Sequence, residues 1–266
     1  MPKISVLMGI YNCARYLDEA LESVQNQTFE DFEVIMCDDG SKDQTAEIAK
    51  VWEAKDGRFH LVMNDCNHGL AYTLNHCLEF VTGEYIVRMD GDDISVPDRF
   101  ERLLKAANEN PEFDVIGTGC DLFDEHGIWG EFITSGIPGK YEAFMQKTVS
   151  HASVIMKTSS LRAIGGYNTE ADNARAEDYD LWCRMVEAGF KIMSIPDKLY
   201  QVRWDRINYY SRRPFKTKWA WAKLVGYWHR RMKLGARGMD KVILTYVKVF
   251  VPSSIKSLYH KVCFRK

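Results

Sequence analysis

The first half of the chain alternates between two hydrophobic patterns. Short continuous apolar runs suit buried strands of a parallel sheet, and the segments between them carry apolar residues at helical spacing. The predicted strands are 3–10, 33–37, 59–63, 85–89 and 114–119, and the predicted helices are 14–26, 44–55, 70–81 and 97–108. This alternation predicts an α/β fold with a doubly wound, mostly parallel sheet and right-handed crossovers.

Beyond residue 119 the elements are more widely spaced. We expect a strand at 153–156, a helix at 177–186, and helical segments after residue 215. The 266 residues, 46% of them hydrophobic, can bury a large core in one domain with an appendage. Because composition changes near Arg203, we predict a domain over 1–205 and a basic amphipathic helical tail over 206–266.

The net charge of −2 conceals a strong asymmetry. Residues 203–266 hold 17 Lys and Arg against two Asp, whereas the first 202 residues hold 18 basic and 35 acidic residues. Basic helices rich in aromatic residues suit an anionic membrane surface, so we predict peripheral contact with the membrane through the tail. Nucleic acid is not expected as a partner, because no nucleic-acid-binding module is recognisable. A tail that packs on the core and offsets its acidity is the structural alternative.

The cysteines and the apolar runs indicate a cytoplasmic location, and together with the basic tail we expect a peripheral position on the inner face of the cell membrane. Seven cysteines show no CxxC or other metal-ligand spacing, which is typical of reduced, buried thiols. We expect no signal peptide, since the first apolar run is short and leads directly into polar residues. No apolar segment approaches the ~20 residues of a membrane-spanning helix.

An acidic cluster follows the predicted strand at 85–89. Asp90, Asp92 and Asp93 lie within four positions, and carboxylates so close together repel one another unless a cation neutralises them. A divalent ion such as Mg²⁺ or Mn²⁺ fits, since hard ions take oxygen ligands and often bind substrate phosphates as well. An acidic turn before a helix is the alternative, with Asp93 or Ser95 as the cap and Pro97 as the first helical residue. That alternative explains only one of the three acids.

Polar residues also follow the first and second predicted strands. Tyr11 and Asn12 end the first, and Asp38-Asp39-Gly40-Ser41 ends the second. In a parallel sheet these positions share one edge with the acidic cluster, where ligands bind. A tyrosine face can stack on a base, and an aspartate can accept hydrogen bonds from a base or ribose. The pattern predicts a nucleotide site, and it lacks both the G-x-G-x-x-G fingerprint and the Walker lysine.

These motifs resemble family 2 glycosyltransferases, which have the GT-A fold. The resemblance covers about residues 1–205 and rests on the following motifs: Tyr11-Asn12, residues 20–29, Asp38–Ser41, residues 67–70, Leu74-Asn75, residues 88–94, Pro97–Arg99, His151, Gly165–Tyr167 and residues 177–184. Two departures stand out. The histidine that many relatives carry two positions after the Arg203 equivalent is replaced by Asp205, which casts doubt on a further metal or diphosphate contact there. The segment from Gln201 to Trp204 also falls one residue short of the Q-x-x-R-W motif of processive synthases, and this favours single additions.

The resemblance implies a role for each matched residue. Residues 1–119 would bind the nucleotide sugar and 120–205 the acceptor. The nucleotide-sugar contacts would be Tyr11, Asn12, Asp39, Arg88 and Asp90, with the base at Tyr11 and Asp39 and the ribose at Asp90. Asp92 would hold the metal, and Asp178 would be the general base of an inverting displacement. Glu177 and His151 are weaker candidates for acceptor binding. The acids at 177–180 could instead stabilise a helix N-terminus, and His151 could be a core histidine.

We therefore expect a metal-dependent hexosyl- or N-acetylhexosaminyl-transferase. Its donor would be a nucleotide sugar, with a UDP-sugar favoured, and its acceptor a saccharide or lipid-linked saccharide in bacterial surface-polysaccharide assembly. Two alternatives remain, a nucleotidyltransferase and a non-catalytic nucleotide-sugar-binding protein.

Overall fold

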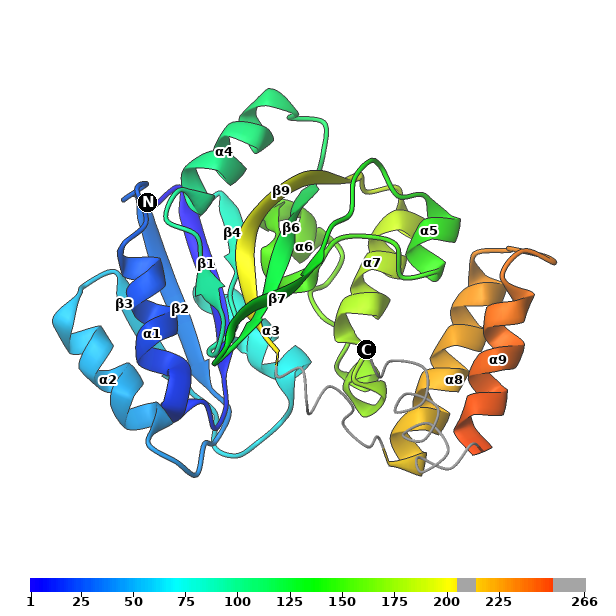
Figure 1. Cartoon of the computed structure of the whole chain (residues 1–266), viewed down its shortest axis with the longest axis horizontal. Coiled ribbons are helices and arrows are strands. Elements are labelled where there is room, and N and C mark those ends of the chain that lie inside the picture. The colour runs from blue at the N-terminus through cyan, green and yellow to red at the C-terminus, as the bar shows by residue number, and fades with distance from the viewer. Residues whose placement is uncertain (205–213, 251–266) are drawn as a thin grey trace.

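The computed structural model is a twisted sheet with helices on both faces and a helical pair at one side (Figure 1). It describes residues 1–204 and 214–250. The strands are β1 (Ile4–Ile10), β2 (Phe32–Asp38), β3 (Phe59–Met63), β4 (Tyr85–Arg88), β5 (Ile94–Ser95), β6 (Val115–Asp124), β7 (Gly127–Phe132), β8 (Ile155–Lys157) and β9 (Ile192–Arg203). The α-helices are α1 (Ala14–Gln25), α2 (Thr45–Lys55), α3 (Leu70–Phe80), α4 (Arg99–Glu109), α5 (Lys140–Phe144), α6 (Thr158–Ala163), α7 (Glu177–Ala188), α8 (Phe215–Arg231) and α9 (Met239–Phe250). Two 3₁₀ turns, η1 (His151–Ser153) and η2 (Thr169–Ala174), complete the described elements.

The strands lie in the order β3-β2-β1-β4-β8-β6-β9-β5, and β7 pairs with β6. The first four strands are parallel to one another, and β6 is parallel to β9. By contrast, β8, β5 and β7 are antiparallel to their neighbours. The predicted GT-A sheet, doubly wound and mostly parallel, is confirmed. Because β2 and β4 flank β1 on opposite sides, the chain changes direction across the sheet here, and such switch points are where ligands bind.

The sheet has a separate apolar core on each face. Ile4, Val6 and Met8 of β1 pack into a cluster with α1, α2 and α4, whereas Leu7 packs into a cluster with α3, α6 and α7. Successive strand residues point to opposite faces, so a strand buried on both sides reads as a continuous apolar run. This is why β1, β2 and β4 were recognisable from the sequence.

A third apolar cluster joins the C-terminal helices to the rest of the molecule. Phe144 of α5 and Tyr179 of α7 pack against Val225 and Trp228 of α8. The α8–α9 pair stands beside α5 and α7 and is separated from β1 to β3 by the rest of the sheet (Figure 1). No helix in the described ranges has both the length and the apolarity to cross a bilayer. The division near residue 205 stays a prediction, and its parts at 206–213 and 251–266 lie outside the described residues.

Two predictions of local structure need correction. Pro97 is not the first residue of a helix, because α4 begins at Arg99 with Asp98 as its cap residue. The strand predicted to end at residue 119 continues to Asp124 and turns back as β7. Residues 121–132 are mostly half-buried or exposed, so their apolar pattern is too weak to identify the hairpin.

Candidate active site

The ends of β1 and β2 are held together by hydrogen bonds, and we call residues 11–13, 38–41 and 90–93 the strand-end rim. The Asp39 N–H donates to the Ile10 carbonyl at 2.9 Å. The Asn12 N–H donates to Ser41 Oγ at 3.0 Å, and Asn12 Oδ1 accepts from the Lys42 N–H at 2.8 Å. Asn12 has a φ of 49°, a left-handed conformation that asparagine tolerates better than most residues. Its amide therefore braces the two loops.

The third part of the rim packs against the first. A Cβ added to Gly91 would come within 2.7 Å of Cys13 Sγ, so the loop after β4 lies directly on the loop after β1. Tyr11 is 46% exposed beside them, which leaves its ring accessible. The shared edge expected from the sequence is therefore present.

Asp39 is almost fully buried beneath the loop before α3, with 3% of its surface exposed. Its Oδ1 accepts hydrogen bonds from Asn64 Nδ2 at 2.8 Å and the His68 N–H at 2.9 Å, and its Oδ2 accepts from the Gly69 N–H at 2.9 Å. A carboxylate offers about four acceptor positions. The three donors leave one position for a ligand, and the predicted contact with a base stays a prediction.

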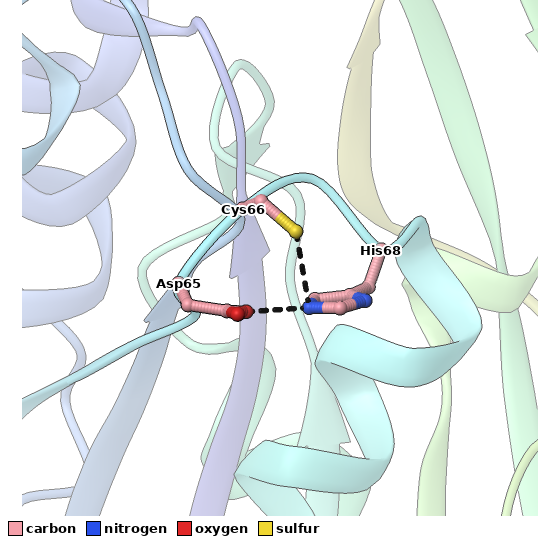
Figure 2. Close-up of side chains that lie close together, drawn as sticks. All are labelled: Asp65, Cys66 and His68. Carbon is pink, nitrogen blue, oxygen red and sulfur yellow. Dashed lines mark hydrogen bonds and ion pairs between the residues drawn. The ribbon is translucent and has the colours of Figure 1, made fainter.

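The loop that covers Asp39 also carries a cluster that the sequence did not reveal. Figure 2 shows Asp65 and Cys66 converging on His68, whose Nε2 lies 2.6 Å from Asp65 Oδ1 and 3.4 Å from Cys66 Sγ. The three donor atoms lie within 4.8 Å of one another on exposed side chains. The hydrogen bond to His68 lowers the pKa of Asp65, and desolvation together with the charge of Asp65 raises the pKa of the Cys66 thiol. An exposed thiol thus lies next to the strand-end rim.

Arg88 lies behind Asp90 and not on the exposed rim. It is 1% exposed, and its Nη2 lies 2.5 Å from Asp90 Oδ1. Burial opposes the charge on Arg88, but the carboxylate of Asp90 outweighs it and holds the pKa of Arg88 above its usual value. Asp90 is also held through its backbone N–H, which donates to the Tyr200 hydroxyl at 3.0 Å. Arg88 is thus placed to orient Asp90, and its predicted contact with the nucleotide sugar stays a prediction.

Asp92 and Asp93 differ in their surroundings. Asp93 is 3% exposed and accepts the Arg203 N–H at 2.7 Å, while Arg203 Nε donates to the Asp92 carbonyl at 2.8 Å. Burial and the neighbouring carboxylates raise the pKa of Asp93 to about 8 and that of Asp92 to about 6. Within the described ranges the Asp92 carboxylate has no ion pair and no hydrogen bond to another side chain. Asp93 therefore holds the loop to β9, and Asp92 is the acid whose charge is least compensated.

A second buried arginine lies beneath the cluster. Arg99 is fully buried and donates through Nη2 to the carbonyls of Arg88 at 2.8 Å and Ala152 at 2.7 Å. Burial lowers its pKa to about 10. Three arginines thus face three aspartates here. The crowding of the acids therefore does not by itself require a metal ion, because neighbouring arginines supply positive charge, and Asp92 is the carboxylate that fits a metal ligand.

His151 has the contacts of a core residue. Its Nε2 lies 2.8 Å from the Tyr167 hydroxyl, and its ring meets the edges of Tyr167 and Trp182. Burial and the charge of Arg88 lower the pKa of His151 well below its usual value, so the ring is neutral at pH 7. These contacts fit the core alternative.

Tyr167 connects the rim electrostatically to the start of α7. Burial raises its pKa, Arg88 lowers it, and the carboxylates of Glu177, Asp178 and Asp90 raise it further. The carboxylates at the rim and those on α7 therefore both affect the pKa of Tyr167, so the two groups of acids lie around the same part of the molecule.

The acids at the start of α7 have distinct roles. Asp180 is 2% exposed, lies 2.8 Å from Arg184 Nε and accepts Trp228 Nε1 at 3.0 Å, so it fastens α8 to α7. Asp178 accepts the Tyr179 N–H at 2.6 Å and lines a cavity of about 290 Å³. The structure thus assigns the structural alternative to Asp180 and leaves Asp178 facing a space that a ligand could enter.

Sequence reasoning passed over the residues that support the acids. Arg99 stood out only as part of the Pro97–Arg99 motif. Arg203 stood out only as the arginine of a motif whose histidine, two positions later, is missing. Tyr200 gave no signal, because its role depends on β9 lying beside β5.

Comparisons with known proteins agree with this architecture. The model of the family described as Glycosyl transferase family 2 matches residues 5–175. EpsE of Bacillus subtilis strain 168, which is named a glycosyltransferase, is 38% identical over 261 residues, covering 98% of this chain and 94% of its own. The amylovoran biosynthesis glycosyltransferase AmsE of Erwinia amylovora is 30% identical over 203 residues, or 75% of each chain.

Solved structures show the same fold. Residues 1–349 of Staphylococcus aureus TarS in complex with UDP superpose with a TM-score of 0.68 at 20% identity, covering 85% of this chain and 65% of that one. The complex of the same protein with UDP-GlcNAc gives the same TM-score and identity. Together with the family match over most of the chain, these comparisons show that this protein belongs to glycosyltransferase family 2.

Proposed function

We propose that this protein is an inverting, metal-dependent glycosyltransferase that moves a sugar from a UDP-sugar to a hydroxyl of a saccharide or lipid-linked saccharide. The observation that carries the proposal is the strand-end rim, where Tyr11, Asp39, Asp90 and Asp92 meet at a switch point of the sheet. The names of AmsE and of the O-antigen biosynthesis glycosyltransferase WbnJ favour a role in surface-polysaccharide assembly. The UDP and UDP-GlcNAc complexes of TarS favour a uridine nucleotide and a hexosyl or N-acetylhexosaminyl group.

The donor would lie along the rim. The exposed ring of Tyr11 offers a face for the base, and Asp39 retains one acceptor position for a base N–H. Asn12 holds this part of the rim in shape, and Asp90, oriented by Arg88, can accept a ribose hydroxyl. Asp39, Asn12 and Asp90 are fixed by neighbours before a ligand arrives, which lowers the cost of binding.

Asp92 would hold Mn²⁺ or Mg²⁺. Its raised pKa, and the absence of an ion pair to it among residues 1–204 and 214–250, fit a carboxylate that a divalent ion would stabilise. When bound, such an ion offsets negative charge on a departing diphosphate.

Asp178 would be the general base. Its carboxylate takes the proton of the acceptor hydroxyl as that oxygen bonds to the anomeric carbon, and the bond from this carbon to the diphosphate oxygen breaks with its electron pair. One displacement inverts the anomeric centre. Glu177, one position earlier on α7, could orient the acceptor.

The C-terminal helices would bring the enzyme to the inner face of the cell membrane. Along α9, Ile243, Leu244, Val247 and Phe250 are each more than half exposed, and Phe215 of α8 continues this apolar face. Exposed lysines and arginines on the same two helices suit anionic headgroups, each worth about 1 kcal/mol near the surface. Phosphatidylglycerol vesicles should therefore retain the full-length protein at low salt and release it at high salt. The double variant Ile243→Glu, Val247→Glu should stay in solution, and equal retention would contradict this part of the proposal.

The activity itself is tested by release of UDP. A thermal-shift screen of UDP-sugars with Mn²⁺ identifies the donor, because a bound ligand raises stability by mass action. Incubation of that donor with extracted lipid-linked saccharides should then release UDP and yield a glycosylated lipid. Formation of UTP and a sugar 1-phosphate when diphosphate is added in place of the acceptor would indicate a nucleotidyltransferase, and binding without product in either assay would indicate a non-catalytic protein.

A further inference from the structure

The loop between β3 and α3 brings three different metal-binding side chains together on the surface. Asp65, Cys66 and His68 offer a carboxylate oxygen, a thiol sulfur and an imidazole nitrogen, and these atoms lie within 4.8 Å of one another (Figure 2). All three side chains are exposed, so an ion can reach them from solvent. In the part of the chain whose side chains the structure describes, no other three residues of these types converge in this way.

The spacing of the three atoms is close to the spacing around a tetrahedral ion. With bonds of about 2.0–2.3 Å, the ligand atoms of a tetrahedral Zn²⁺ site lie about 3.4–3.6 Å apart. His68 Nε2 already lies 3.4 Å from Cys66 Sγ, and it lies 2.6 Å from Asp65 Oδ1. The Asp65 side chain is 85% exposed, so it can move outward by the roughly 1 Å that an ion between the two would require. Until an ion binds, the hydrogen bond between Asp65 and His68 keeps these two donors together.

A thiol and an imidazole select a different ion from the carboxylates of the strand-end rim. Thiolate and imidazole ligands favour Zn²⁺, whereas Mg²⁺ and Mn²⁺ prefer oxygen ligands. One sulfur, one nitrogen and one oxygen ligand leave the fourth tetrahedral position to a water molecule. Cys66 would bind as the thiolate and give its proton to solvent, and His68 would bind through Nε2 as the neutral ring.

Neighbouring residues hold two of the three ligands in place. The His68 ring stacks on the Tyr72 ring, with centroids 4.3 Å apart and an angle of 30° between the planes. The Cys66 backbone packs against Gly40, where an added Cβ would come within 2.8 Å of the Cys66 carbonyl carbon. Ligands that are held before the ion arrives lose less freedom when it binds.

The same loop supplies two of the hydrogen bonds that hold Asp39. The N–H groups of His68 and Gly69 each donate to a different carboxylate oxygen of Asp39 at 2.9 Å. An ion held by Asp65, Cys66 and His68 would restrict the segment that carries these donors. The loop would then open less often above Asp39.

We propose that Asp65, Cys66 and His68 bind one Zn²⁺ ion, which stabilises the loop over Asp39. This site is separate from the one proposed for Mn²⁺ or Mg²⁺ at Asp92. It requires neither a nucleotide nor sugar transfer, so it stands or falls independently of the proposed function.

Titration of Co²⁺ into the metal-free full-length protein tests the site, because Co²⁺ replaces Zn²⁺ and reports a bound thiolate by a charge-transfer band in the near ultraviolet. The wild type should develop this band with one equivalent of Co²⁺, and Zn²⁺, which binds more tightly, should remove it. Cys66→Ser should show no band. His68→Gln should bind Zn²⁺ at least tenfold more weakly, since even a residue that only supports a ligand is worth about 10–100-fold in metal affinity.

Two variants control for binding elsewhere. His60→Gln removes an exposed histidine of β3 outside the cluster, and Asp92→Asn removes the proposed ligand at the rim. Both should keep the band and the Zn²⁺ affinity of the wild type. A wild type without the band, a band that survives Cys66→Ser, or an unchanged Zn²⁺ affinity of His68→Gln would overturn the proposal. Loss of the band in Asp92→Asn would also overturn it, because the ion would then lie at the rim, where Cys13 packs against Gly91.

Hydrogen exchange tests the effect of the ion on the loop. Exchange of the His68 and Gly69 N–H groups should slow when Zn²⁺ is added to the wild type, because these groups exchange only when the loop opens. The same addition to Cys66→Ser should change nothing. Unchanged exchange in the zinc-bound wild type would overturn the stabilising role.

Discussion

The strand-end rim and the helical side of the molecule, formed by α5, α7 and α8, are built in opposite ways. The rim comes from short loops that each follow a buried strand. Because the carboxyl ends of parallel strands lie at one edge of the sheet, these loops come together there. The helical side joins segments from residues 140 to 231 that only tertiary packing places side by side. Placement on the rim follows from local sequence, whereas placement on the helical side depends on the whole fold. The two sides should therefore respond differently to substitution.

The largest difference is expected at the rim. Asp92→Asn should reduce transfer by about 10³-fold or more, because charge stabilisation by a metal is worth several kcal/mol. Asp93→Asn is the matched control one residue away. Burial and the neighbouring carboxylates raise the pKa of Asp93, which favours its neutral form, and the amide oxygen of asparagine can still accept the Arg203 N–H. Initial rates with and without EDTA check this, and full activity of Asp92→Asn would remove the metal from this site.

On the helical side, Asp178→Asn should lower kcat by roughly 10²–10⁴, the usual effect of removing a general base. Its fold should be intact, since the substitution keeps the oxygen that accepts the Tyr179 N–H. Single-turnover rates with the identified donor measure the loss. A loss of less than about threefold would leave the base unassigned.

Asp180 sharpens the comparison, because it lies two residues from Asp178 with the opposite expectation. Asp180→Ala should lower the free energy of unfolding by about 3 kcal/mol, since it removes the carboxylate that pairs with Arg184 Nε and leaves the Trp228 N–H without its acceptor. Urea unfolding compares it with Asp178→Asn, for which we expect a smaller change because the amide oxygen can still accept the Tyr179 N–H. Equal destabilisation would mean that both acids are structural.

The smallest effect is a pH dependence at the rim. Asp92 has its pKa raised to about 6 by burial and by Asp90, so protons compete with a metal ion below that pH. Mn²⁺ affinity should fall about tenfold per pH unit below pH 6 and level off above it. The effect of pH on stability has the opposite direction. Because the folded state binds this proton more tightly than the unfolded state does, the free energy of unfolding of the metal-free protein rises as the pH falls through 6. Calorimetric titrations from pH 5 to 8 test both, and an affinity independent of pH would contradict the assignment.

What could be predicted from the sequence follows the same division. Strands β1, β2 and β4, the shared edge and the acid cluster were visible because continuous apolar runs lead directly into polar motifs. The arginines beneath the acids were not interpretable, since nothing local shows that Arg99 reaches the carbonyls of Arg88 and Ala152. In the sequence, Asp178 and Asp180 both belong to one acidic helix start, and only the contact of Asp180 with α8 distinguishes their roles. In the sequence, Trp221 belongs to an amphipathic tail, and only the tertiary structure places it beside Asp178.

Titration of UDP with Mn²⁺ into Asp92→Asn and Asp178→Asn tests the division most directly. If the donor lies on the rim and the base on the helical side, Asp178→Asn should bind UDP with the affinity of the wild type. Asp92→Asn should bind it more weakly and with no response to Mn²⁺. Weakened UDP binding in Asp178→Asn, or an unchanged Mn²⁺ response in Asp92→Asn, would contradict the separation of donor and acceptor functions on which this account depends.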